Sequence, residues 1–418
     1  EITDMDPAEA QDFLEAGMLH HFPRVKEFFP RPVQTDREGK ATNVFPPGPF
    51  VLSDKKHKTD KQGKPITKYR IISVQVNTPT SPLDRFHETI QAAAIGPALK
   101  ARSLRIYEDT SINPYHIISN SKDAAATVPA QTNNLNNHDI VNCYGALTTH
   151  GEYGLIKQLS RVTDLAVAHQ HSTKEMPATA PCGFILGGKR TFKATKTGCE
   201  PAIRPYAAFT KLGRHGPDMT TPNRRPRDDD DTIPPVLFTA KKLKQLIAWS
   251  LASAHNRFGQ LVWRQRSGLP AGVPAGVNYA NHYFHSFEDA AARPGYNRVY
   301  AMQKLLKKAT ADDEIARLTA AIKETQETYG LHNNDIRYVD DTLNVTLDSG
   351  DDYTAYLRKI YHCDETGLEI EETSTISKAE GRGPRKACKC EFTDMQFLRS
   401  ANGDTFRRLF DKKRNYAQ

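Results

Sequence analysis

The sequence predicts an α+β fold, in which antiparallel strands pack with helices. The strand prediction begins at residues 335–347, where apolar and β-branched residues flank Asp340 and Asp341 on both sides. Adjacent side chains of a strand point to opposite faces, so these two carboxylates meet only if the chain turns between two strands. The helix prediction rests on residues 80–111, whose apolar spacing gives a buried face of Leu83, Phe86, Ile90 and Leu99.

Other segments follow the same two periodicities. Helices are expected at 6–14, at 238–249 with Thr239 as the N-cap, and at 353–361. One or two further helices are expected over 298–329, with core candidates Leu305, Leu306, Ile315, Leu318 and Ile322. Strands are expected in a hairpin at 258–265, at 368–371, and in a terminal hairpin of 390–399 with 406–410.

Composition limits the classes of protein. The chain has 418 residues and a net charge of +8, a surplus that favours a polyanionic partner. Mean hydropathy is −0.61 and no run of 18 apolar residues occurs, so a membrane span is not expected. Six cysteines in a chain this long do not predict a disulfide framework, and Cys388 and Cys390 lack the second pair of a zinc site.

A basic hairpin is predicted at residues 51–76, with a Gly/Pro turn at its centre. Its cations would donate hydrogen bonds to phosphates of a triphosphate or of a nucleic-acid backbone. A charged hairpin that is merely solvated is the alternative. The residues concerned are Lys55, Lys58, Lys68 and Arg70.

Paired carboxylates indicate a metal site. Asp340 and Asp341 at a hairpin tip repel each other unless a cation joins them, and hard oxygen ligands suit Mg²⁺. A surface turn with two solvated acids is the alternative. Asp139 enters a second short apolar strand, with the aromatic Tyr144 five residues later, although a strand with one edge acid would look the same.

A loop rich in glycine and proline covers residues 268–276 and opens a helix. Glycine has no Cβ, so such a loop lets the backbone approach a ligand closely. Residues 157–235 are expected to form an insertion that is partly disordered. Gly187-Gly188-Lys189-Arg190 within it lacks the spacing of a phosphate-binding loop.

Taken in order, these motifs resemble a reverse transcriptase, and most closely the class of Penelope-like retroelements. The resemblance covers roughly residues 50–160 and 236–412. Five motifs carry it: Lys55-Lys56-His57-Lys58 with Arg70-Ile71-Ile72-Ser73; Asp139-Ile140 to Tyr144; Gln265 to Gly272 with Ala280-Asn281-His282-Tyr283; Arg337 to Asp341; and Phe397-Leu398. The chain departs from the class at Ala271, Gly276 and Arg399, where the class has Met, often Ser, and an acid.

The resemblance implies a right-hand polymerase fold, with fingers, an antiparallel palm sheet packed on helices, and a short or absent thumb. The implied organisation is an N-terminal arm (1–50), fingers (51–137), the first catalytic strand of the palm (138–156), the insertion (157–235), a fingers/palm helix with the nucleotide-contacting loop (236–297), the rest of the palm (298–399) and a C-terminal hairpin or start of a thumb (400–418).

The resemblance also implies roles for individual residues. Asp139, Asp340 and Asp341 would be catalytic and would hold two Mg²⁺ ions, about 3.5–4 Å apart, with Mn²⁺ as the alternative ion. Nucleotide contacts would come from Lys68, Arg70, Tyr144, Gln265, Gly268, Pro270, Gly272 and Lys378. Contacts to the nucleic acid would come from Lys55, Lys58, Tyr338, Phe397 and Leu398.

The implied function is RNA-directed DNA polymerisation, with an RNA template, a DNA or RNA primer and deoxynucleoside triphosphates as partners. Two alternatives stay open. In the first, the chain is a catalytically silent, reverse-transcriptase-like subunit that binds RNA, with protein partners, in a ribonucleoprotein particle. In the second, the chain is a basic RNA-binding module without polymerase ancestry. An intracellular location, nuclear or mitochondrial, is expected, and the sequence does not choose between the two.

Overall fold

The computed structural model describes residues 2–31, 34–35, 38–42, 45–54, 69–74, 78–132, 134–173, 182–195, 198–212, 232–347, 349–376, 388–392, 395–399 and 404–409. The fold mixes helices and strands, as the α+β prediction requires. The chain forms two compact units: residues 1–99 with 148–279, and residues 100–147 with 280–418. They are called unit 1 and unit 2. No helix in the described ranges is both long and apolar enough to cross a lipid bilayer.

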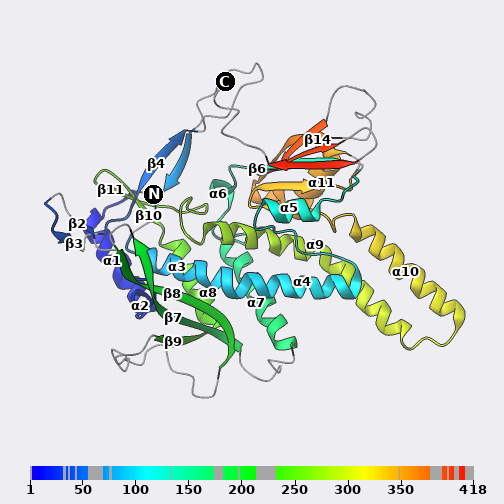
Figure 1. The fold of residues 1–418 in the computed structure, drawn as a ribbon, viewed down its shortest axis with the longest axis horizontal. Coiled ribbons are helices and arrows are strands. Elements are labelled where there is room, and N and C mark those ends of the chain that lie inside the picture. Colours follow the sequence, from blue (N-terminus) through cyan, green and yellow to red (C-terminus); the bar gives the residue numbers. More distant parts are fainter. Residues whose placement is uncertain are drawn as a thin grey trace. The chain divides into compact units, whose positions relative to one another are not determined.

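The described residues of unit 1 form helices and three sheets. Figure 1 shows the strands β7, β8 and β9 of this unit in green. Its helices are α1 (Pro7–His21), α2 (Val25–Phe28), α3 (Ser81–Ile90), the π-helix η1 (Gln91–Ile95), the first turn of α4 (Gly96–Thr110), α7 (Leu155–Ser172) and α8 (Ala240–Ala252). Its strands are β1 (Ile2–Thr3), β2 (Gln34–Thr35), β3 (Ala41–Thr42), β4 (Gly48–Asp54), β5 (Tyr69–Ser73), β7 (Cys182–Thr195), β8 (Gly198–Lys211), β9 (Thr232–Thr239), β10 (His255–Phe258) and β11 (Leu261–Arg264).

Several local predictions in unit 1 are confirmed. The Asp6 carboxylate accepts hydrogen bonds from the N–H groups of Ala8 and Glu9 and so caps α1. Thr239 caps α8 through the N–H of Lys242. The helical segment predicted at 80–111 is α3, η1 and α4, and the four residues of its predicted apolar face, Leu83, Phe86, Ile90 and Leu99, are fully buried.

The strands of unit 1 pair in two main sheets. The first has the order β1-β11-β10-β4-β5, in which β10 and β4 are parallel and the other pairs antiparallel. It contains a hairpin of β10 and β11, whose first strand begins at His255, before the predicted range of 258–265. It also contains both strands of the basic hairpin predicted at 51–76. The second has the order β8-β7-β9.

Residues 157–235, predicted to be a partly disordered insertion, are described in part, at 157–173, 182–195, 198–212 and 232–235. The described part of this segment is regular structure: α7 is followed by β7 and β8, each 14 residues long, and β9 pairs with β7. Figure 1 shows β7 and β8 as one long, curved, two-stranded ribbon. Gly187-Gly188-Lys189-Arg190 lies within β7, in agreement with the rejection of a phosphate-binding loop. The strands β7 and β8 were not predicted, because glycine and lysine, which are depleted in strands, interrupt the β-branched and aromatic residues of this segment.

Unit 2 is built around an antiparallel sheet with the order β12-β13-β6-β14. Its strands are β6 (Leu135–Val141), β12 (Ile336–Tyr338), β13 (Asp341–Asn344), β14 (Glu369–Ile376), β15 (Cys388–Phe392), β16 (Met395–Arg399) and β17 (Thr405–Leu409). Its helices are the rest of α4, α5 (Ser121–Thr127), α6 (Cys143–Ala146), α9 (Gly276–Leu306) from residue 280, α10 (Asp312–Gly330), α11 (Gly350–Ile360) and α12 (Cys363–Thr366). Helix α11 lies beside β6 and β14 (Figure 1).

The core of unit 2 corrects two predictions. The segment 390–399, predicted as one strand, contains the separate strands β15 and β16, which form a three-stranded sheet with β17. Of the core candidates in 298–329, Leu318 is buried, but Leu305 and Ile315 are exposed. Leu305 lies at the exposed C-terminal end of α9, and Ile315 lies on α10, most of whose residues are exposed, so one apolar residue per turn did not require burial.

Candidate functional site

Three strands of unit 2 bring acidic residues into one row. In the register of the sheet, Asp139 of β6 pairs with Asp341 of β13, and on its other side Asp139 pairs with Glu371 of β14. Residues directly opposite each other on neighbouring strands project from the same face. The sheet therefore places Asp341, Asp139 and Glu371 side by side on one face, with Asp340 next in the chain at the turn.

Two of the three predicted catalytic carboxylates are thus brought together by direct strand pairing. Asp340 is joined to the same strands, because its carbonyl oxygen accepts a hydrogen bond of 3.1 Å from the N–H of Ile140. The pKa of the Cys143 thiol depends on the charges of two of these carboxylates. Burial raises the pKa of Cys143 well above its usual range, and the negative charges of Asp340 and Asp139 raise it further. Asp139, Asp340 and Cys143 therefore share one neighbourhood.

The turn that carries Asp340 is strained. Strands β12 and β13 form the predicted hairpin, closed by the pair Tyr338 and Asp341 around Val339 and Asp340. Val339 has a φ of 58°, which is a rare conformation for a β-branched residue because its Cβ crowds the backbone. Such conformations cost about 1–3 kcal/mol and persist only where the surroundings hold them.

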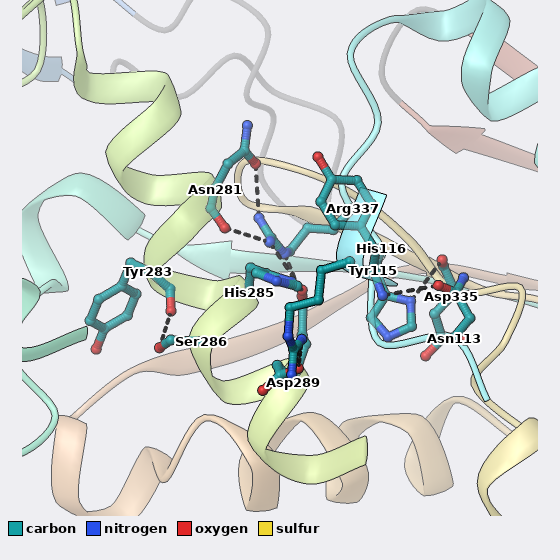
Figure 2. A network of polar contacts seen from close by, with 12 residues as sticks. Asn113, Tyr115, His116, Asn281, Tyr283, His285, Ser286, Asp289, Asp335 and Arg337 are labelled. Carbon is teal, nitrogen blue, oxygen red and sulfur yellow. Dashed lines mark hydrogen bonds and ion pairs between the residues drawn. The ribbon is translucent and has the colours of Figure 1, made fainter. Parts of the chain in front are cut away.

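A buried polar network holds Val339 in place. Figure 2 shows the contact between Arg337 and Asn281 within this network. The N–H of Val339 donates a hydrogen bond of 3.1 Å to the side-chain oxygen of Asn281, on α9. The Arg337 guanidinium donates to the Val339 carbonyl at 3.2 Å, and to both the side-chain and main-chain oxygens of Asn281 at 2.9 Å. Both polar backbone groups of the strained residue are therefore fixed by side chains from β12 and α9.

Arg337 is itself neutralised by a carboxylate. The guanidinium donates two hydrogen bonds to Glu288, at 2.6 and 3.2 Å, in the bidentate geometry that gives the strongest ion pairs. Both side chains are almost completely buried. Burial by itself would raise the pKa of Glu288, but the adjacent Arg337 outweighs it and lowers the pKa to about 2. The Tyr361 hydroxyl donates a further bond of 3.0 Å to Glu288.

Sequence reasoning gave no role to Asn281, Glu288 or Glu371. Asn281 and Glu288 are seven residues apart, so they lie on the same face of α9 after two turns. A buried arginine needs a buried acid, but the sequence could not show that Arg337 is buried. For Glu371, the alternation around residues 368–371 was the available signal, and it left the partner strand undetermined.

The other residues predicted for this region have the following positions. Tyr144 lies half-buried in α6, directly after β6. Tyr338 is 36% exposed at the end of β12. Phe397 is fully buried in a core cluster with Phe392, Met395 and other apolar residues, so its side chain is not presented to a ligand. Leu398, next to it, is half-buried.

The predicted nucleotide-contacting loop belongs to unit 1. Pro270 is buried, and Gly268 and Gly272 have φ values of 84° and 105°, a region that favours glycine. A Cβ on Gly272 would lie 2.3 Å from the carbonyl oxygen of Ser73, at the end of β5. The N–H of Ser73 donates to the Ala271 carbonyl at 2.8 Å, so loop and strand are joined.

Gln265 fixes the start of the loop. Its backbone N–H donates to the Ala254 carbonyl at 2.8 Å, and its side-chain amide donates to the Ser267 carbonyl at 3.0 Å. Arg70 lies on β5, three residues before Ser73, and pairs with Ser53. The side chain of Arg70 and the predicted residues Lys55, Lys58, Lys68 and Lys378 lie outside the described part of the structure.

The row of carboxylates is chemically suited to a hard divalent cation. Like charges directly opposite each other on neighbouring strands destabilise a sheet, and a bound cation would remove that cost. Among the described side chains, no three from His, Cys, Asp and Glu converge closely enough to hold one metal ion. The Mg²⁺ prediction therefore remains a prediction.

Comparison with known proteins found likeness in structure but none in sequence. No family model matches the chain, and no curated protein matches it. Among solved structures, the chain is similar to telomerase from Candida albicans, a structure that contains the TWJ fragment of telomeric RNA. The TM-score is 0.40 at 12% sequence identity, over 87% of this chain. The chain spans about half, 47%, of the length of that telomerase chain.

Proposed function

We propose that the protein is an RNA-directed DNA polymerase that extends a primer by templated nucleotidyl transfer. The observation that carries the proposal is the pairing of Asp139 with Asp341 beside a strained turn that presents Asp340. Strain at a turn is a feature of functional sites, because a fold that only needed a hairpin would use glycine or asparagine there. The order of the sequence motifs is the second support.

Each residue has a defined part in this proposal. Asp139, Asp340 and Asp341 would hold two divalent cations, which supply positive charge to the attacking 3′-oxygen and to the triphosphate. The Arg337–Asn281–Glu288 network would keep the carboxylates in position while charge develops. Tyr144, directly after β6, would limit the space at the sugar of the incoming nucleotide. Catalysis of this kind is mostly positioning and charge neutralisation.

The loop at 268–276 and strand β5 would contact the nucleotide or the template. Gly272 allows the backbone of the loop to lie against Ser73, and this contact would fix the loop next to the strand that carries Arg70. RNA as template, DNA or RNA as primer and deoxynucleoside triphosphates as substrates are the partners of the proposed reaction. A Penelope-like origin is part of the same proposal and rests on the motif order alone.

Primer extension tests the proposal. The parent chain is assayed on an RNA template with Mg²⁺, beside the double variant Asp340→Asn/Asp341→Asn. The matched control is Asp312→Asn/Asp313→Asn, which removes another adjacent acidic pair, on the exposed first turn of α10. Extension by the parent and the control, and none by the first variant, is the expected result. A thermal melt of each protein shows whether it is folded.

The second candidate is a catalytically silent subunit that binds RNA in a ribonucleoprotein particle. The sequence departures at Ala271 and Arg399 favour it, because Ala271 lies in the predicted nucleotide-contacting loop and Arg399 follows Phe397 and Leu398, the predicted contacts to nucleic acid. Folded parent protein that binds RNA but extends no primer with Mg²⁺ or Mn²⁺ would exclude the polymerase and support this second candidate.

A further inference from the structure

The ribbon of β7 and β8 is strongly basic. Its two strands contain five cationic residues and one acid, Glu200; the cations are Lys189, Arg190, Lys193, Arg204 and Lys211. β8 is an edge strand of the described sheet, because the order is β8-β7-β9. An edge strand with this charge is disfavoured for pairing with another strand and is suited to a polyanion.

One face of the ribbon combines cations with an aromatic ring. Lys189 pairs directly with Arg204, and Gly187 pairs directly with Tyr206, so these residues lie on the same face, two positions apart along each strand. Lys189 and Arg204 are exposed, and Tyr206 is 41% exposed. Within the described part of the chain, neither cation has an acidic side chain at ion-pair distance. Like charges directly opposite each other destabilise a strand pair, and a bound anion between them would relieve that repulsion.

Tyr206 offers a flat surface beside these cations. A Cβ on Gly187 would lie 2.1 Å from the Cζ atom of Tyr206, so the tyrosine ring covers the glycine. One side of the ring is therefore occupied by the ribbon, and the exposed side faces outward. An exposed aromatic face next to paired cations is the arrangement that binds single-stranded nucleic acid, in which an unpaired base stacks on the ring and the cations contact phosphates.

We propose that this face of the ribbon, formed by Lys189, Arg204 and Tyr206, binds single-stranded nucleic acid. A duplex is disfavoured because its bases are already stacked on each other and cannot stack on Tyr206. A lipid surface is disfavoured because, within the described part of β7 and β8, Tyr206 is the one large apolar side chain that is exposed on this face. The proposal does not rest on the proposed polymerase function, because it needs neither the carboxylates nor metal ions.

The test measures binding of 12-nucleotide oligouridine RNA and oligothymidine DNA by fluorescence anisotropy. The full-length chain carries Asp340→Asn/Asp341→Asn, and EDTA is present, so polymerisation is absent from the measurement. Arg204→Glu is compared with Arg190→Glu. The latter makes the same charge change on the same ribbon, but Arg190 pairs with Ile203 and so lies on the opposite face.

Arg204→Glu is expected to weaken binding about tenfold and to lower the salt dependence of the affinity, whereas Arg190→Glu changes the affinity less than about twofold. Tyr206→Leu is expected to weaken binding of both oligonucleotides by about five- to tenfold, whereas Tyr206→Trp retains it. Equal losses for Arg204→Glu and Arg190→Glu would show a general charge effect and overturn the proposal.

Photo-crosslinking gives a second readout that does not depend on the stability of a variant. Oligonucleotides carrying 4-thiouridine or 4-thiothymidine are irradiated with the same catalytically inactive chain, and crosslinked peptides are identified by mass spectrometry. Crosslinks to the peptide that contains Tyr206 support the proposal. Crosslinks confined to other peptides overturn the proposal. It is also overturned if polyglutamate displaces the oligonucleotides equally well from the parent and from Tyr206→Leu, since that outcome identifies a site for an acidic polypeptide.

Discussion

Replacing Arg337 with methionine should destabilise unit 2 and misplace the turn that carries Asp340. The guanidinium makes five hydrogen bonds, two to Glu288, two to Asn281 and one to Val339. Methionine fills similar volume but donates none of them. The variant therefore leaves a buried carboxylate without its cation and a strained residue without one of its two supports.

Two independent estimates give the loss of unfolding free energy in Arg337→Met. Removing one partner of a buried ion pair costs about 3–5 kcal/mol, because the other charge stays buried without compensation. The pKa of Glu288, lowered from 4.5 to about 2, corresponds to about 3 kcal/mol of favourable interaction with the charged form. A loss of about 3–5 kcal/mol in the free energy of unfolding of unit 2 is therefore expected.

The effect of pH on the contribution of Glu288 to stability should have opposite signs in the parent and in Arg337→Met. In the parent, the depressed pKa of Glu288 contributes stability that is present above about pH 4.5 and is lost as the pH falls towards 2. In Arg337→Met, burial is left as the main influence and raises the pKa of Glu288 above its usual value. The contribution of this carboxyl to stability should then increase, not decrease, as the pH falls below neutral.

Urea unfolding followed by hydrogen-exchange mass spectrometry measures both effects on peptides of unit 2. In Arg337→Met, the peptide containing Val339 should exchange its amide hydrogens faster than in the parent. The N–H of Val339 is bonded to Asn281, and Asn281 loses its contacts with Arg337 in this variant. Primer extension should fall by about 100-fold or more, the consequence of a displacement of about 1 Å at a catalytic group. The double variant Arg337→Met/Glu288→Leu should recover much of the stability, because no buried charge remains, but not the activity.

Two results would refute this reasoning. The first is an unfolding free energy of Arg337→Met within about 0.5 kcal/mol of the parent, which is the range of ordinary surface substitutions. The second is a double variant no more stable than the single variant, since then the unpaired Glu288 charge is not the source of the loss. The conservative variant Arg337→Lys is the control; it keeps the charge but cannot reach Glu288, Asn281 and Val339 together.

Four further outcomes are expected. Gly272→Ala should destabilise unit 1 and lower primer extension, since its Cβ would meet the Ser73 carbonyl at 2.3 Å; unchanged urea unfolding would contradict this. Asp84 is buried, which raises its pKa to about 7, so the stability of unit 1 should fall as the pH rises from about 4 to 7 and Asp84→Asn should remove that slope; a slope that persists in the variant would assign it to another group. Phe397→Ala should cost about 3–5 kcal/mol of unfolding free energy while RNA affinity per folded molecule stays the same, and a selective loss of affinity would return Phe397 to the binding site. Glu371→Gln should raise the thermal midpoint measured in EDTA, through about 0.2–1 kcal/mol of relieved repulsion, and a lower midpoint would show that Glu371 already has a stabilising partner.

Local sequence patterns determined much of the secondary structure. The caps of α1 and α8, the buried face of α3 and α4, and the hairpins β10–β11 and β12–β13 all follow from residues close together in the chain. These features depend on short-range hydrogen bonds and on apolar periodicity, so one sequence is enough to predict them. The long ribbon β7–β8 was missed because its register comes from pairing and packing, not from a strong local alternation.

What only the tertiary structure decided is which distant residues meet. The sequence marked Asp139, Asp340 and Asp341 as candidates, but strand pairing decided that Asp139 lies directly opposite Asp341 and also opposite Glu371. Burial decided that Phe397 is a core residue and that Arg337 needs both Glu288 and Asn281. Residues far apart in sequence meet only when hydrophobic burial repays the entropy of closing long loops, and no local pattern encodes that balance.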